Sequence, residues 1–364
     1  MSGQGLVTAA VNNVSGTTQN TSIQTSCQAR RSDHLAFTVV YSVLFLVGLI
    51  LNGFILWFHC CQPLRSSSKS LMIYLKNLTV ADFLLCLSLP LRVMENATSS
   101  AAAHLLYCSF GASMLFLNMY ASILFMGYIA WNRYEKVVHP FRNCFLLSAR
   151  TACIISTATW VFLLVPVTTY MTMLLNDGRQ QRSTDCSCED FHSELLREIY
   201  RASHFCAFTT FLLVLISMIF SYYRTSRKLL HADQRQSSSF SSKKLLRSRK
   251  KMLVLVCVFC VSFAPYHLVR LPLMFYQEAV FVKLFYYPLQ LATIMSVLNV
   301  CLDPLVYFFL CKDFRVQVKL RLRGFRVIHQ RVNAARTEGE AQLRNMDINN
   351  EVSFSTTSRS NCDL

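Results

Sequence analysis

The sequence predicts an all-α membrane protein, a bundle of seven transmembrane helices followed by a short amphipathic eighth helix. Two observations lead to this fold class. The chain of 364 residues is 53% hydrophobic and only 15% charged, whereas a soluble domain carries about 25% charged residues. Its apolar residues also gather into seven runs, each close to the roughly 20 residues that cross a hydrocarbon core as a helix. Seven such runs do not fit the buried helices of a soluble protein.

Polar connectors separate the seven runs. The runs are Leu35–Phe58, Leu71–Pro90, Leu105–Ala130, Thr151–Leu175, Phe205–Tyr223, Met252–Phe275 and Leu284–Leu310. After the last run, KDFRVQVKLRLRGF has the pattern of a helix that lies on a membrane surface, near Asp313–Phe325. We therefore expect four parts along the chain: a glycosylated tail at 1–34, a seven-span domain at 35–310, the amphipathic helix within 311–326 and a disordered tail at 327–364.

Basic residues predict the orientation of the spans. The connector 224–251 and the tail 311–364 carry ten lysines and arginines each, whereas the connector 276–283 carries one. Lys and Arg gather on the cytoplasmic side of a membrane. We therefore expect a multi-pass plasma-membrane protein with an extracellular N-terminus and a cytoplasmic C-terminus. The net charge of +17 then reflects topology and contact with anionic membrane lipids, and we expect no nucleic-acid partner.

Sequons and cysteines agree with this orientation. Three Asn-X-Ser/Thr glycosylation sequons lie on the predicted outer side, at Asn13, Asn20 and Asn96. Cys108 stands at the outer end of the third run, and Cys186 and Cys188 lie in the longest outer connector. Because the exterior is oxidising, a disulfide from Cys108 to either of these two cysteines is permitted.

Polar side chains inside the runs are costly in hydrocarbon and mark candidate functional positions. Asp82 and Asp303 are the only acidic residues deep in any run. Two interpretations are open: their carboxyl groups hydrogen-bond to each other and join the helices, or they form a buried site for water or a cation such as Na⁺ at Asp82. The other polar residues of this candidate site are Asn52, Ser122 and Asn299.

A set of landmarks recurs in order along the chain. They are Asn52, Asp82, Cys108, NRY at 132–134, Trp160, FAPYH at 263–267 and DPLVY at 303–307. Over about Leu35–Arg326 the chain thereby resembles the rhodopsin-like (class A) G-protein-coupled receptors. The resemblance implies a receptor that activates heterotrimeric G proteins, and it implies that Cys188 is the partner of Cys108.

The resemblance also assigns a switch to the end of the third run. In this family the arginine of an Asp-Arg-Tyr motif enters the G-protein cavity on activation, which identifies Arg133. Asn132 stands where most members have Asp, and an amide cannot form the ion pair that holds this arginine at rest. The other switch residues that the family implies are Tyr134, Tyr222 and Tyr307. The serine clusters at 237–242 and 353–360 are candidate sites for receptor kinases, and hence for arrestin recruitment.

Longer segments narrow the resemblance. SLMIYLKNLTVADFLL, NRYEKVVHPFR, FAPYHLVRLP and NVCLDPLVYFFLCKDFR are similar to the purinergic nucleotide receptors, in particular the ADP and UDP-sugar subgroup. The Asn-Arg-Tyr variant and PLQLATIMSVLN also resemble the platelet-activating-factor receptor. Both kinds of ligand carry phosphate. We expect a nucleotide receptor, with a receptor for platelet-activating factor or another lysophospholipid, or an orphan or peptide receptor, as alternatives.

The candidate ligand site lies at the outer ends of the runs. Arg92, His204, His267 and Arg270 surround one predicted mouth, and a guanidinium offers a planar fork of donors that suits phosphate. The remaining expected contacts are Phe116, Tyr120, Tyr266 and Gln290. The resembled ADP receptors have a Lys-Glu pair where this chain reads Leu289-Gln290, and this part of the site favours a lipid.

Other classes of protein lack their signatures here. The run 284–310 contains no lysine that could form a retinal Schiff base. The chain has no H-E-x-x-H or G-x-S-x-G motif of an enzyme, and it shows no internal repeat of a transporter. We therefore expect neither catalysis nor a cofactor, apart from Na⁺ at Asp82.

Overall fold

The structure is a computed structural model. It describes residues 35–61, 69–98, 101–139, 148–180, 188, 192–234, 239–275, 279–311, 314–321 and 323. Within these ranges the chain is almost entirely helical, and it forms no strand there. The prediction of an all-α protein is confirmed.

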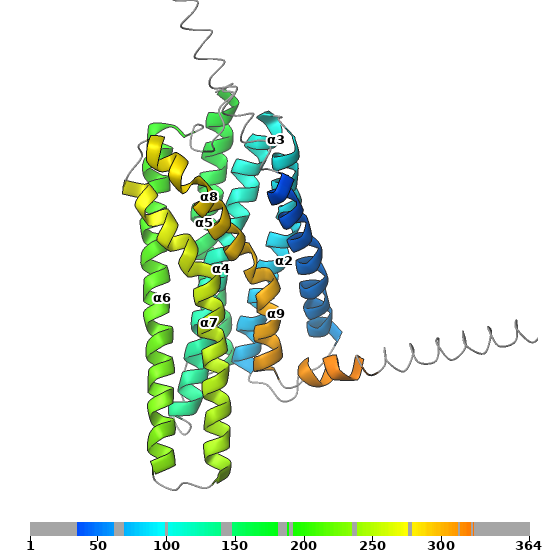
Figure 1. The fold of residues 1–364 in the computed structure, drawn as a ribbon, viewed down its shortest axis with the longest axis vertical. Helices are drawn as coiled ribbons and strands as arrows, with labels where there is room; N and C mark the ends of the chain where they lie inside the picture. Colours follow the sequence, from blue (N-terminus) through cyan, green and yellow to red (C-terminus); the bar gives the residue numbers. More distant parts are fainter. Residues whose placement is uncertain are drawn as a thin grey trace, which may run out of the picture. The chain divides into compact units, whose positions relative to one another are not determined.

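Seven of the described helical segments are long and apolar enough to cross a membrane. In chain order they are the first span Leu35–Cys61, α2 Lys69–Ala97, the third span (α3 Ala101–Leu106, the π-helical turn η1 Tyr107–Gly111 and α4 Ala112–Val138), α5 Ala149–Gln180, α6 Glu194–Gln234, α7 Ser239–Phe275 and the seventh span (α8 Ala279–Val297 and α9 Asn299–Leu310) (Figure 1). The prediction of seven spans is confirmed.

The fifth and sixth helices begin earlier than the apolar runs predict. Helix α6 starts at Glu194 instead of Phe205, and α7 starts at Ser239 instead of Met252. An apolar run marks only the length that lies in hydrocarbon, whereas a helix continues wherever its charged side chains reach water. His204, the residue just before the predicted fifth run, therefore lies well inside α6 and does not open the span.

The third span is the centre of the bundle. Helix α4 packs against α2, α5, α6 and α7, and α6 runs beside α7 along much of its length (Figure 1). By contrast, α5 and α6 turn large apolar side chains outward, with Phe162 62% and Leu213 65% exposed. A soluble protein rarely exposes apolar surface on this scale. The exposed faces agree with a multi-pass membrane protein.

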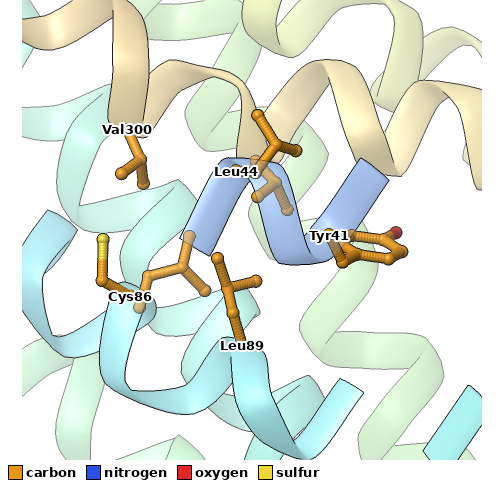
Figure 2. Packing of buried hydrophobic residues seen from close by; sticks show 7 residues of the cluster. Tyr41, Leu44, Cys86, Leu89 and Val300 are labelled. Atoms are coloured by element: carbon orange, nitrogen blue, oxygen red, sulfur yellow. The ribbon is translucent and has the colours of Figure 1, made fainter. Parts of the chain in front are cut away.

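The first span approaches α2 and α9 closely. A cluster of buried side chains joins these helices, and Figure 2 shows Tyr41, Leu44, Cys86, Leu89 and Val300 within it. A β-carbon added at Gly48 would lie 2.6 Å from a Val300 methyl and 2.9 Å from the Cys86 sulfur. Glycine permits this approach because it has no side chain.

An amide from the first span hydrogen-bonds to the first turn of α9. Pro304 lies inside α9 and has no N–H to donate to the carbonyl of Val300, four residues earlier. The Nδ2 of Asn52 donates to that carbonyl at 2.9 Å and to the Gly48 carbonyl at 3.0 Å. Asn52 is therefore a structural link between the first span and α9.

The chain divides into two units, Met1–Leu310 and Cys311–Leu364. In the second unit, residues 314–321 are helical, which confirms a short helix after the seventh span, expected near Asp313–Phe325. Other predictions fall outside the described residues: the tails 1–34 and 327–364, the sequons at Asn13 and Asn20, the alternative cysteine Cys186 and the serine cluster 353–360. The serine cluster 237–242 overlaps the first turn of α7, and Asn96 lies in the last turn of α2.

Candidate functional site

A cavity lies between α4, α6 and α7, toward the end of the bundle that carries Cys108 (the Cys108 end). Its lining residues are Tyr120, His204, Phe208, Tyr266, His267, Arg270, Leu271 and Met274. Five of these were expected from the sequence, and the structure brings them together from three helices. Phe208, Leu271 and Met274 were missed, because apolar residues at helical spacing look the same in a sequence whether they face a cavity or the core.

The histidine at the base of this cavity is a hydrogen-bond relay. His267 is 3% exposed. Its Nδ1 lies 2.8 Å from the Phe263 carbonyl and its Nε2 lies 3.0 Å from the Tyr120 hydroxyl. A carbonyl can only accept, so Nδ1 carries the proton and Nε2 accepts from the tyrosine. Its ring also stacks on Phe211 with the centroids 4.0 Å apart. His267 therefore orients Tyr120 as a neutral group.

Arg270 stands on α7, one turn beyond His267. Its guanidinium lies over the Tyr200 ring, 5.3 Å from the centroid, and Nη2 donates to the Tyr200 hydroxyl. The Tyr200 ring in turn packs on His204 with the centroids 4.2 Å apart. The aromatic stack and the hydrogen bond fix the guanidinium at the edge of the cavity. Tyr200 was missed because α6 was expected to begin after it.

Phe116 packs behind the lining residues. Its ring lies 4.5 Å from that of Tyr120 and 5.7 Å from that of His204. It therefore supports two side chains that line the cavity and is not itself among those that line it.

Arg92 lies in a separate polar cluster between α2 and α8. Its Nη2 donates to the Gln290 side-chain oxygen at 2.7 Å, and its Nη1 donates to a Glu95 carboxylate oxygen at 3.2 Å. The guanidinium also lies 4.5 Å from the centroid of the Tyr107 ring. Arg92 and Gln290, both expected as ligand contacts, are absent from the residues that line the cavity. In this structure they bind each other.

A disulfide joins Cys108 to Cys188. This is the pairing that the family resemblance implies. The bridge closes a sequence separation of 80 residues and holds Cys188 against the start of the third span. Leu196, Tyr107 and Leu174 pack around it. Cys188 is thereby fixed at the Cys108 end of the bundle.

The predicted buried polar site assembles in the middle of the bundle. Asp82, Asp303 and Asn299 are completely buried. Asn118 donates to Asp82 Oδ1 at 3.1 Å, and Asn299 donates to Asp303 Oδ2 at 2.9 Å. The two carboxyl groups are neighbours in this buried cluster and interact with each other. Asn118 was missed, because the sequence offers no sign that it faces Asp82.

Several oxygens of this site have no hydrogen-bond donor. They are Asp82 Oδ2, Asn299 Oδ1 and Asp303 Oδ1, and all are buried. Ser122 Oγ, one turn after Asn118 on α4, is also buried without a hydrogen-bond partner. Two ionised carboxylates cannot lie side by side in a low-dielectric interior without compensation. Either a shared proton or a bound cation would supply it, and an all-oxygen donor set suits a hard cation. The residues present therefore fit Na⁺.

The predicted switch lies at the opposite end of the bundle, which we call the Arg133 end. Asn132 is 2% exposed, and its Nδ2 donates to the Ser70 hydroxyl of α2 at 2.8 Å. Arg133 Nη2 donates to the Leu310 carbonyl at 3.0 Å, and Lys251 Nζ donates to the same oxygen at 3.2 Å. A carbonyl at the end of α9 thus receives donors from α4 and α7.

The three switch tyrosines differ in their surroundings. Tyr134 is buried beside Trp131, with the ring centroids 5.3 Å apart. The Tyr222 hydroxyl lies 3.4 Å from Arg249 Nε. Tyr307 is 1% exposed, and its hydroxyl is directed toward α2.

The comparison with known families agrees with this architecture. The family model of the seven-transmembrane receptors of the rhodopsin family matches residues 51–307. The chain belongs to this family.

Its relatives place it in the purinoceptor-like subgroup. Purinoceptor 14 of Bos taurus is 32% identical over 285 residues, which cover 76% of this chain and 82% of the relative. G-protein coupled receptor 87 of Mus musculus is 32% identical over 291 residues, covering 78% of each chain. Purinoceptor 13 of Homo sapiens is 30% identical over 290 residues, covering 77% of this chain and 79% of the relative. The resemblance seen in the sequence is confirmed.

Membership of this family defines the broad class of function. The protein is a receptor and not an enzyme. Its class implies an extracellular ligand and a G-protein partner. The described residues form a cavity at the Cys108 end and a cluster of donors on the Leu310 carbonyl at the Arg133 end.

Proposed function

We propose that this receptor binds a small phosphate-bearing ligand, a nucleotide in the first place, in the cavity between α4, α6 and α7. One observation carries the proposal: Arg270 holds a guanidinium at the edge of a cavity whose walls are mostly aromatic. A guanidinium fork matches the oxygens of a phosphate. Aromatic rings such as Tyr120 and Tyr266 offer stacking surface to a base.

The fixed position of Arg270 strengthens this assignment. Its contact with Tyr200 restrains the side chain before a ligand arrives, so less conformational freedom is lost on binding. His267 is buried and has no anionic partner among the residues that the structure describes, so the neutral imidazole is favoured and it contributes no charge. Arg270 is therefore the principal anion contact of the cavity. A second contact from Arg92 remains a prediction, and its guanidinium would first have to leave Glu95.

A lysophospholipid is the second candidate, and a specific observation favours it. Gln290, which stands in place of the acidic residue of the ADP receptors' Lys-Glu pair, is bonded to Arg92. The cavity wall also includes Phe208, Leu271 and Met274. One cationic side chain and an apolar wall suit a lipid that carries a single phosphate group on a hydrocarbon chain. A peptide or orphan ligand would be indicated if neither phosphate class acts.

The proposal includes the orientation of the receptor and its intracellular partners. The Cys108 end is extracellular and the Arg133 end is cytoplasmic, as the distribution of basic residues predicts. The heterotrimeric G protein then binds at the Arg133 end. Phosphorylation of the serine clusters by receptor kinases would recruit arrestin there. Na⁺ bound at Asp82 would stabilise the arrangement in which both carboxylates are ionised.

A matched panel tests the ligand class. Cells that express the receptor are exposed to nucleotides and nucleotide sugars alongside the corresponding nucleosides, and to lysophospholipids alongside the corresponding monoacylglycerols, with calcium and cAMP as readouts. Mock-transfected cells are the control for endogenous receptors. The proposal predicts that at least one phosphate-bearing compound acts at far lower concentration than its dephosphorylated counterpart. Equal activity of both members of every active pair would refute it.

A further inference from the structure

The hydroxyl of Tyr307 lies within hydrogen-bonding distance of three groups that come from two helices. It contacts the Leu75 carbonyl and the Thr79 hydroxyl, both on α2. From the first span, His59 places Nε2 at 3.3 Å from the same oxygen. The two rings meet edge to face, with centroids 5.5 Å apart and an angle of 64° between the planes. Nothing in the switch motifs of the sequence pointed to His59.

The available protons assign the direction of each contact. The Leu75 carbonyl can only accept, so the Tyr307 hydroxyl gives it its single proton. The tyrosine oxygen can then only accept, and His59 must carry its proton on Nε2 to donate there. This leaves Nδ1 as a bare acceptor, which agrees with the observation that Nδ1 is buried without a hydrogen-bond partner. A neutral imidazole in this tautomer satisfies the site.

We propose that His59 is a positioning residue for receptor activation. It acts through a hydrogen bond that holds the Tyr307 side chain against α2. The family resemblance assigns Tyr307 to the G-protein cavity, whereas here its side chain is buried against α2 and the first span. To reach the cavity, the hydroxyl must leave His59, Thr79 and Leu75 together. A group that bonds to one conformation and not the other shifts the population toward the one it bonds. The proposal rests on family membership and is independent of the ligand.

The test separates the hydrogen bond from ring packing. His59→Phe keeps an aromatic ring beside Tyr307 but removes the donor, whereas His59→Gln offers a side-chain N–H in place of the ring. Cys60→Ala, at the exposed neighbouring position, is the matched control. Ligand-independent activation of each Gα class is measured at equal surface expression. His59→Phe should raise it about twofold to twelvefold, the population change that follows the loss of one neutral hydrogen bond, and His59→Gln should restore most of the difference.

A second background shows whether His59 acts through the tyrosine hydroxyl. In the Tyr307→Phe background there is no hydroxyl for His59 to hold. Adding His59→Phe there should therefore change ligand-independent activation, and the unfolding temperature, much less than the same substitution does in the wild-type receptor. Three results would overturn the proposal. One is an unchanged signal for His59→Phe with every Gα class. Another is an equal rise for His59→Gln and His59→Phe, and the third is the same effect of His59→Phe in both backgrounds.

Discussion

Replacing Asn132 by Asp should lower ligand-independent signalling. Asn132 lies beside Arg133 and donates to the Ser70 hydroxyl at 2.8 Å, while its own Oδ1 is buried without a donor. In Asn132→Asp the Ser70 hydroxyl can reverse and donate to the carboxylate, so that contact is retained. The new charge is available to Arg133, whose guanidinium now donates to the neutral Leu310 carbonyl.

The magnitude follows from the exchange of partners. A hydrogen bond to a charged group contributes about 1.5–3 kcal/mol, whereas a neutral one contributes about 0.5–1.5 kcal/mol. Exchanging the Leu310 carbonyl for a carboxylate therefore stabilises the resting arrangement by about 1–2 kcal/mol. This free energy corresponds to a roughly fivefold to thirtyfold smaller population of the active state. The gain exists only while Arg133 stays near the carboxylate, so it favours rest.

The assay is ligand-independent G-protein activation at matched surface expression. Asn132→Ala is the control, because it removes the bond to Ser70 without adding a charge. The reasoning predicts a fall for Asn132→Asp and no fall for Asn132→Ala. It would be refuted if Asn132→Asp signalled at the wild-type level or above, or if both variants fell equally.

Three further predictions concern residues that support or surround the two sites. Cys188→Ser should lower the unfolding temperature of the solubilised receptor, since a bridge to Cys108 typically contributes about 2–4 kcal/mol through the denatured chain; an unchanged temperature would contradict this. Asp82→Asn should abolish any difference in unfolding temperature between NaCl and KCl, and a difference that persists would argue against a cation at this carboxylate. Arg92→Met should destabilise the receptor because it leaves Glu95 without its guanidinium partner, and should reduce ligand potency less than Arg270→Ala; the reverse order would make Arg92 the main anion contact.

The number of spans could be read from the sequence because membrane crossing imposes a length and a composition. Each apolar run became a helix, yet the starts of α6 and α7 were misplaced, because charged residues such as Glu194 and Arg197 continue the helix beyond the apolar run. The break in the seventh span at Leu298, between α8 and α9, was also not visible, since the apolar run continues through it.

The candidate site was predictable where local spacing decides it. His267 and Arg270 share one face of α7, and their positions three residues apart were enough to group them. The partner of Arg92 was not predictable, because Gln290 is 198 residues away along the chain. The same holds for Tyr200 beside Arg270 and for His59 beside Tyr307. Such contacts are set by packing between helices, which no periodicity records.

The recognition of phosphate by Arg270 is the central claim of this account. It is tested most directly by the potency ratio between an active phosphate-bearing ligand and its dephosphorylated counterpart, measured in the wild-type receptor, Arg270→Ala and Arg270→Lys. A guanidinium that holds a phosphate contributes about 2–4 kcal/mol, roughly 30-fold to 1000-fold in potency. The ratio should therefore collapse toward one in Arg270→Ala and recover only in part in Arg270→Lys, which keeps the charge but loses the fork. The same ratio in wild type and in Arg270→Ala would contradict the claim.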